Sequence, residues 1–170
     1  MLVLASTALL LTCSGSYANS IAYQGEPSSR APAGSNVKGF VLSLQPERSQ
    51  YHLGSPIWVT VEFRNETGKE QVGMDFNSLN SGYDFLISDL KTGQAVPRNK
   101  YSTFGAGGHS MSTTWDLAPN NSWFGRFRLD LLYNFKEPGT YSVQVTTGHP
   151  VIHNHTVTMR SNKITITVAP

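Results

Sequence analysis

Residues 129–145 carry the pattern that most restricts the fold of this chain. Apolar and polar residues alternate in two runs, Leu129–Phe135 and Thr140–Val145, which flank Pro138-Gly139. Side chains two positions apart lie on the same face of a strand, so each run predicts a strand with one buried face. Proline followed by glycine favours a turn. The pattern therefore predicts a β-hairpin of the kind found in small β-sandwiches.

The same alternation recurs along the chain. Its clearest example is Ile57–Phe63, in which Ile57, Val59 and Val61 share one face and Trp58 lies on the other. Further strands are expected at 40–44, 71–76, 83–89, 94–96, 112–117, 123–132, 156–160 and 164–168. Short strands at this spacing predict an all-β fold, an immunoglobulin-like antiparallel β-sandwich of eight or nine strands with Greek-key connections.

Tyr141 is a candidate corner tyrosine. It follows the Pro138-Gly139 turn, where such sandwiches place a tyrosine whose hydroxyl bonds to the backbone a few residues upstream. The chain carries no pair of cysteines for the disulfide of antibody domains. The core is therefore expected to rest on aliphatic and aromatic burial.

The first eighteen residues are apolar and end on Ser16-Tyr17-Ala18, so they predict a signal peptide. This apolar run is too short to span a membrane as a helix. Residues 19–36 are rich in Gly, Pro and Ser and predict a flexible leader, followed by one folded domain over 37–170. No transmembrane segment is expected.

Cys13 is the only cysteine and lies inside the predicted signal. Leu11 and Thr12 suit lipoprotein processing poorly, so a lipid anchor at Cys13 is disfavoured. Export without disulfides favours a secreted or periplasmic bacterial protein.

The sequence indicates a protein that is not an enzyme. No histidine is followed by Glu as in a zinc-peptidase helix, and Gly108–Ser112 lacks the closing glycine of a nucleophile elbow. The net charge of +2 is spread over mixed signs, which disfavours nucleic acid as a partner. No cofactor is predicted.

Two segments are candidate sites. The glycine-rich loop 99–111 carries Tyr101, Phe104, His109 and Met111, which are the predicted binding residues. Long loops on rigid sandwiches often carry binding. The alternative interpretation of this loop is a disordered segment.

The second segment suggests a metal site. If one strand ran unbroken from His153, then His153, His155 and Met159 would share a face, with His149 nearby. Imidazole and thioether ligands suit copper, and the histidines also suit zinc. The alternative interpretation is the polar tip of a surface loop.

Trp58 also has two interpretations. Either it covers the second face of a buried strand, or it forms an exposed aromatic platform, together with Tyr51, for a sugar or a partner.

Several short motifs resemble a known group of domains. They are Leu42-Ser43-Leu44, Tyr51–Ile57, Phe63-Arg64-Asn65, Tyr83-Asp84-Phe85, Leu117-Ala118-Pro119, Leu131–Phe135 and Pro138–Tyr141. Most of residues 37–147 resembles the bacterial intracellular-proteinase-inhibitor (BsuPI) family and the non-catalytic N-terminal β domain of deuterolysin-like secreted zinc peptidases. The resemblance implies a β-sandwich and a function as a peptidase inhibitor or peptidase-associated module. It carries no reactive-site residue onto this sequence.

These observations predict an exported, non-enzymatic domain that binds another exported protein, with a peptidase as a candidate partner. Copper or zinc binding through the His149–His155 segment, with Met159 as a further candidate ligand, is one alternative. A structural module of a cell-surface assembly, whose sheet edges pair with a neighbour, is another.

Overall fold

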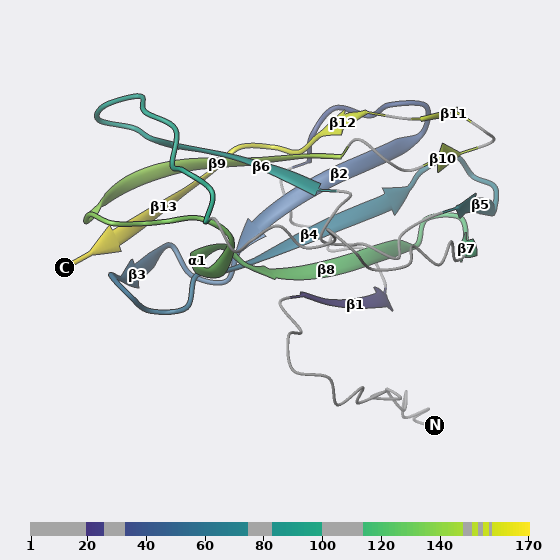
Figure 1. Ribbon diagram of the computed structural model, residues 1–170. Helices are drawn as coiled ribbons and strands as arrows, with labels where there is room; N and C mark the ends of the chain where they lie inside the picture. Colours follow the sequence, from purple (N-terminus) through teal and green to yellow (C-terminus); the bar gives the residue numbers. More distant parts are fainter. Residues whose placement is uncertain are drawn as a thin grey trace, which may run out of the picture.

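A computed structural model describes residues 20–25, 33–74, 83–99, 114–147, 151–152, 155–156 and 158–170. Strands dominate these residues, and their only α-helix is the single turn α1 (Leu129–Leu132). The fold is therefore all-β, with mainly antiparallel pairing in its sheets (Figure 1). Thirteen strands are assigned within the described residues, more than the eight or nine expected, because several of them are very short.

The first sheet has four antiparallel strands. Their order is β1 (Ser20–Gly25), β8 (Ser122–Arg128), β4 (Trp58–Asn65) and β2 (Phe40–Pro46). The two outer strands, β1 and β2, therefore lie at opposite edges of this sheet.

The second sheet is organised around β9 (Gly139–Thr147). One edge of β9 pairs with β6 (Tyr83–Asp89), and the other pairs with β12 (Met159–Arg160) and β13 (Ile164–Ala169). The short strand β3 (Gln50–His52) completes this sheet and runs parallel to β13.

A third, small sheet lies at one end of the molecule (Figure 1). Its order is β11 (His155–Thr156), β10 (Val151–Ile152), β5 (Gln71–Met74) and β7 (Thr114–Leu117). Within the described residues, no helix has the length and apolarity needed to cross a membrane.

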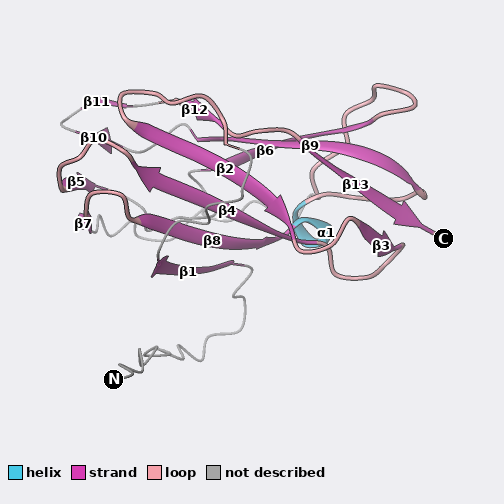
Figure 2. Cartoon of the chain, turned by 180° about the vertical axis from the view of Figure 1, so that it is seen from behind, coloured by secondary structure: helices cyan, strands magenta, loops and turns pink. Residues whose placement is uncertain are grey.

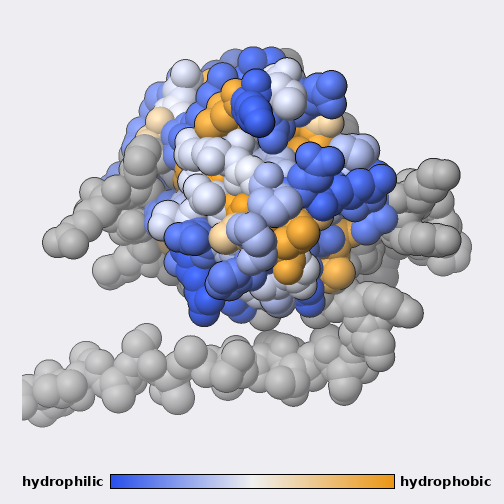
Figure 3. Space-filling model, turned by 90° about the vertical axis from the view of Figure 1, so that its left-hand side faces the viewer, coloured by the Kyte–Doolittle hydropathy of each residue, from blue (hydrophilic) through white to orange (hydrophobic). Residues whose placement is uncertain are grey.

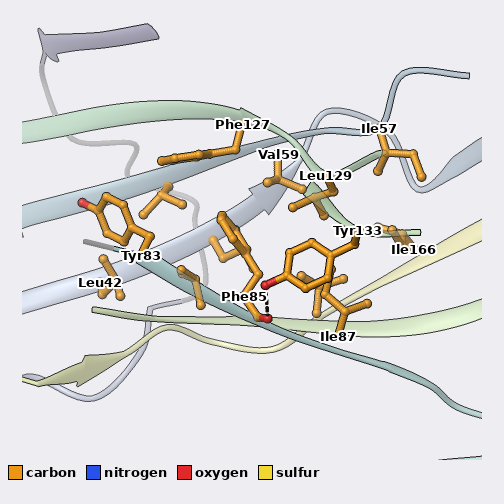
Figure 4. Packing of buried hydrophobic residues seen from close by; sticks show 14 of the residues in the cluster. Leu42, Ile57, Val59, Tyr83, Phe85, Ile87, Phe127, Leu129, Tyr133 and Ile166 are labelled. Atoms are coloured by element: carbon orange, nitrogen blue, oxygen red, sulfur yellow. Dashed lines mark hydrogen bonds between the residues drawn. The ribbon is translucent and has the colours of Figure 1, made fainter. Parts of the chain in front are cut away.

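The hydrophobic core lies between the first two sheets (Figure 4). The alternation predicted for Ile57–Phe63 is confirmed, since Val59, Val61 and Phe63 are almost fully buried. Aromatic rings fill the centre, where Phe127 packs edge-on against Phe85 with ring centroids 5.3 Å apart. Such edge-to-face pairs stabilise a core beyond their buried area.

The predicted strand over Leu129–Phe135 is wrong, because this segment opens with α1. The Tyr133 N–H donates to the Leu129 carbonyl (2.8 Å), which closes one helical turn and buries both side chains. Residues four apart share a helix face, so these two apolar residues fit a turn as well as a strand. The Asp130 carboxylate fixes the turn by accepting the Ile57 N–H (2.9 Å). The predicted hairpin is also wrong, since β9 pairs with β6, β12 and β13.

The predicted terminal hairpin between 156–160 and 164–168 is wrong for a related reason. Both β12 and β13 pair with the same edge of β9, one after the other. Met159 lies opposite Thr147 and Ile164 opposite Val143, so five steps on one strand match four on the other. One extra residue against a partner strand is a β-bulge. Along β9, the two segments β12 and β13 therefore take the place of one continuous strand that contains a β-bulge.

Part of the predicted leader differs from the expectation. Ser20–Gly25 forms β1 and pairs with β8, because β8 offers an edge that a short segment without clear periodicity can join. The predicted signal, residues 1–18, lies outside the described residues. Cleavage of this signal and the absence of a lipid anchor at Cys13 stay predictions.

The corner tyrosine is confirmed. The Tyr141 hydroxyl donates to the Glu137 carbonyl at 2.6 Å, four residues upstream. The ring also packs edge-on against Phe135, with centroids 5.1 Å apart. These contacts hold the chain where it enters β9.

Candidate functional site

The predicted binding residues Tyr101, Phe104, His109 and Met111 lie outside the described residues. The structure describes the chain on both sides of this segment. On the N-terminal side, the Asn99 N–H donates to the Leu132 carbonyl at 2.8 Å.

A polar cluster lies just before this segment. The Arg98 guanidinium pairs with the Asp84 carboxylate and donates from Nε to the Tyr133 hydroxyl (3.2 Å). Tyr133 in turn donates to the Phe85 carbonyl at 2.6 Å, as Figure 4 shows. Burial raises the pKa of Tyr133 above its ordinary value. The cluster ties an exposed arginine to the buried centre of the sandwich.

On the C-terminal side, the segment leads into β7. The Leu117 side chain is fully buried, and its carbonyl accepts a hydrogen bond from Asn65 Nδ2 at 2.9 Å. The same amide donates to the Ala118 carbonyl (3.2 Å). Both flanks of residues 100–113 are therefore bonded to the frame of the domain.

The structure does not bring the proposed metal ligands together on one strand. His155 belongs to β11, which pairs with β10, whereas Met159 belongs to β12, which pairs with β9. The unbroken strand assumed for this site is therefore wrong. Met159 is only 1% exposed and packs in the hydrophobic core. His149 and His153 lie outside the described residues, and among the described residues no three His, Cys, Asp or Glu side chains are placed to hold a metal.

Trp58 is partly buried on the outer face of the first sheet. The Arg126 guanidinium carbon lies 4.0 Å from its ring centroid, and that of Arg128 lies 5.7 Å away. Such cation–π contacts are favourable and orient both partners. Tyr51 takes no part in this surface, because it is buried and its hydroxyl donates to the Trp58 carbonyl at 2.8 Å. We call Trp58, Arg126 and Arg128 the arginine–tryptophan stack.

Carboxylates neutralise the stack. Arg126 pairs with Glu47, and Arg128 Nη2 pairs with Asp130 Oδ2 at 2.6 Å. Sequence reasoning missed both arginines, because their proximity to Trp58 depends on the register between β4 and β8. Alternation along β8 was the available signal, but it does not reveal the partner strand.

A buried carboxylate lies further along the same outer face. Glu62 is 1% exposed, and its Oε1 accepts from the Ser122 hydroxyl at 2.7 Å. Arg64 Nη1 is 3.8 Å from the same oxygen, whereas Oε2 has no hydrogen-bond partner among the described residues. Val41 and Phe124 are also buried on this face and stand apart from the central core. Sequence reasoning missed Glu62, since an outward strand position predicts exposure.

The end of the sandwich that carries β3 and the C-terminus shows apolar residues in separate small patches among polar ones (Figure 3). Large apolar side chains that are exposed in the described residues are Leu53, Leu86, Leu90 and Leu131. Scattered surface leucines are normal and need no partner.

No protein-family model matches the chain, and the search of curated proteins finds no match.

Proposed function

We propose that this chain is an exported, non-enzymatic binding domain that engages another exported protein, and that a secreted peptidase is the first class of partner to test. One observation carries the proposal. The segment 100–113 is joined at both flanks to residues that are bonded to a packed β-sandwich. Function then depends on what this segment contacts.

The fixed flanks support binding because they reduce the number of residues that must become ordered when a partner binds. On one side Asn99 is bonded to Leu132, and Arg98 is bonded to Tyr133. On the other side Asn65 holds the carbonyls of Leu117 and Ala118. A segment on a fixed base loses less conformational entropy on binding than one that is free at its ends.

The composition of the segment supports the same proposal. Tyr101 and Phe104 are aromatic, and aromatic side chains supply large contact areas at protein interfaces. The arginine–tryptophan stack is the competing surface, since Trp and Arg are the residue types most often found at binding hot spots. The test must therefore separate these two surfaces.

The experiment titrates the exported protein against a panel of secreted serine and metallopeptidases and reads residual peptidase activity. Two variants are compared with the wild type. One replaces residues 101–111 by a Gly-Ser sequence of the same length, and the other carries Trp58→Ala. We expect stoichiometric inhibition of at least one peptidase, weakened about 100-fold by the Gly-Ser variant and almost unchanged by Trp58→Ala.

The opposite pattern, with inhibition lost only in Trp58→Ala, would move the contact to the arginine–tryptophan stack. Full peptidase activity with every enzyme would reject the peptidase as partner. Circular dichroism and melting curves confirm that each variant keeps the fold.

A further inference from the structure

The strand β1 is attached to the domain through a single neighbour. It pairs with β8 over six residue pairs, from Ser20 opposite Phe127 to Gly25 opposite Ser122. Among the described strands, β8 is the only one that pairs with it. Figures 1 and 2 both show β1 as the outermost strand of the first sheet.

Removing β1 would leave the outer edge of β8 unpaired. The Leu129 N–H, just after β8, donates to the Ile57 carbonyl beside β4 (2.8 Å). The N–H and C=O groups of successive residues point to alternate sides of a strand. Since the Leu129 N–H points to β4, the backbone groups of Arg126 and Phe124, three and five residues earlier, point to β1. An exposed row of such groups is a template for another strand.

The connection between β1 and the β2 edge is longer than its own sheet requires. Gly34 is fixed at the β2 edge, because its N–H donates to the Leu42 carbonyl at 3.0 Å. From there to the β1 position is four strand spacings, about 19 Å. The nine steps from Gly25 to Gly34 can extend to about 30 Å. The connection therefore does not force β1 onto the β8 of its own chain.

We infer that β1 is an exchangeable strand and that the β8 edge accepts β1 from a second copy of this chain, which gives a strand-exchanged dimer. The second copy is the occupant because it carries the segment that already fits this edge residue for residue. Exchange of an identical element keeps the same pairing and changes only the connection. This interface is independent of the contact proposed for residues 100–113.

The tether sets the concentration at which the dimer forms. A strand joined to its own domain by a short linker competes at an effective concentration of about 1 mM. We therefore expect mostly monomer in dilute solution and a rising dimer fraction towards about 1 mM. A high local concentration of the protein on a surface would also raise the dimer fraction.

The first test compares two proline variants by light scattering over this concentration range. Tyr23 lies opposite Phe124, so its N–H faces β8, whereas the N–H of Ala22 faces away. Tyr23→Pro removes a ladder hydrogen bond, and Ala22→Pro leaves the ladder intact. We expect Tyr23→Pro to abolish the dimer and Ala22→Pro to retain it. A wild type that stays monomeric throughout, or a Tyr23→Pro dimer as stable as the wild type's, would overturn the inference.

A second test does not depend on either proline. Ala22 lies opposite Gly125, and the double variant Ala22→Cys/Gly125→Cys can form a disulfide across this pair. Oxidation near 1 mM should give a covalent dimer that reduction reverses, whereas dilute protein should give a cross-link within one chain. Cross-links only within the chain at every concentration would refute exchange. Absence of any cross-link would refute the β1–β8 register itself. Peptidase inhibition should be equal in all these variants, which separates this inference from the proposed function.

Discussion

Asn65 shows how one buried side chain can organise several turns. It is fully buried, and its Nδ2 donates to the carbonyls of Lys69 (2.7 Å) and Leu117 (2.9 Å) and, at 3.2 Å, to that of Ala118. Its Oδ1 accepts from both the N–H and the hydroxyl of Thr67. The end of β4, the following turn and the segment after β7 thus share one amide.

We expect Asn65→Ala to lower the free energy of unfolding by about 3 kcal/mol, since the buried Leu117 carbonyl and several partly buried backbone groups lose this partner at once. Urea unfolding measures the loss. Asn134→Ala is the matched control, because Asn134 is exposed and should change stability by less than about 0.5 kcal/mol. A similar small loss for both variants would contradict the role given to Asn65.

Tyr141 offers a graded test of the corner. Tyr141→Phe removes the hydroxyl bond to Glu137 and should cost about 1 kcal/mol. Tyr141→Leu also removes the edge-on contact with Phe135 and should cost about 1 kcal/mol more. Thermal or urea unfolding gives both values, and the expectation fails if Phe and Leu are equally destabilising.

At the level of elements, the bulge between β12 and β13 joins the two main sheets. The Ser161 hydroxyl accepts the Val145 N–H at 3.0 Å, a position that a backbone carbonyl fills in a regular ladder. The displaced Asn162 then turns its amide to β2, accepting from the Leu44 N–H and donating to the Leu44 carbonyl, both at 2.9 Å. The Asn162 amide thus makes the two hydrogen bonds that a residue of a neighbouring strand would make with Leu44.

We expect Asn162→Ala to destabilise the protein by about 2 kcal/mol, because Leu44 is fully buried and would lose partners for both backbone groups. Lys163→Ala changes the exposed next residue and should have little effect. Hydrogen exchange at the Leu44 amide gives a local readout. Unchanged protection of this amide in Asn162→Ala would disprove the bond's importance.

The sequence correctly predicted those strands whose own residue pattern is sufficient to determine their structure. The predicted strands 57–63 and 83–89 correspond to β4 (Trp58–Asn65) and β6 (Tyr83–Asp89), because alternation along them matches one buried face. Leu129–Leu132 did not, since residues four apart on a turn satisfied the same apolar positions and Asp130 found a partner in another strand. Strand pairing, the bulge and the arginine–tryptophan stack depend on register between distant segments, which local alternation does not contain.

For the molecule as a whole, we expect the buried tyrosines to set the alkaline limit of stability. Burial is the largest cause that raises the pKa of Tyr51, Tyr83, Tyr133 and Tyr141 above 10.0. A raised pKa in the folded state keeps the phenol neutral there, while the unfolded chain ionises first. The stabilising effect is complete below about pH 10 and is lost as pH rises further.

We therefore expect unfolding midpoints in urea to fall between about pH 10 and pH 12. Tyr83→Phe should reduce this fall. Tyr83 is buried in the wild type and ionises only on unfolding, whereas phenylalanine has no hydroxyl to ionise. Phenolate absorbance should rise together with loss of the fold. A Tyr83→Phe profile parallel to the wild type would show that another group causes the alkaline loss.

The parallel pairing of β3 with β13 sets how the domain bears mechanical load. Bonds from Thr167 N–H to the Ser49 carbonyl (2.9 Å) and from Leu53 N–H to the Ala169 carbonyl (2.8 Å) lie along this pair. Tension that pulls the C-terminal end of β13 away from β3 along the strand axis loads these bonds together, in shear. The other edge of β13 is hydrogen-bonded to β9, so both edges of this strand resist its extraction. We therefore expect the C-terminus to withstand tension when the protein is attached through it.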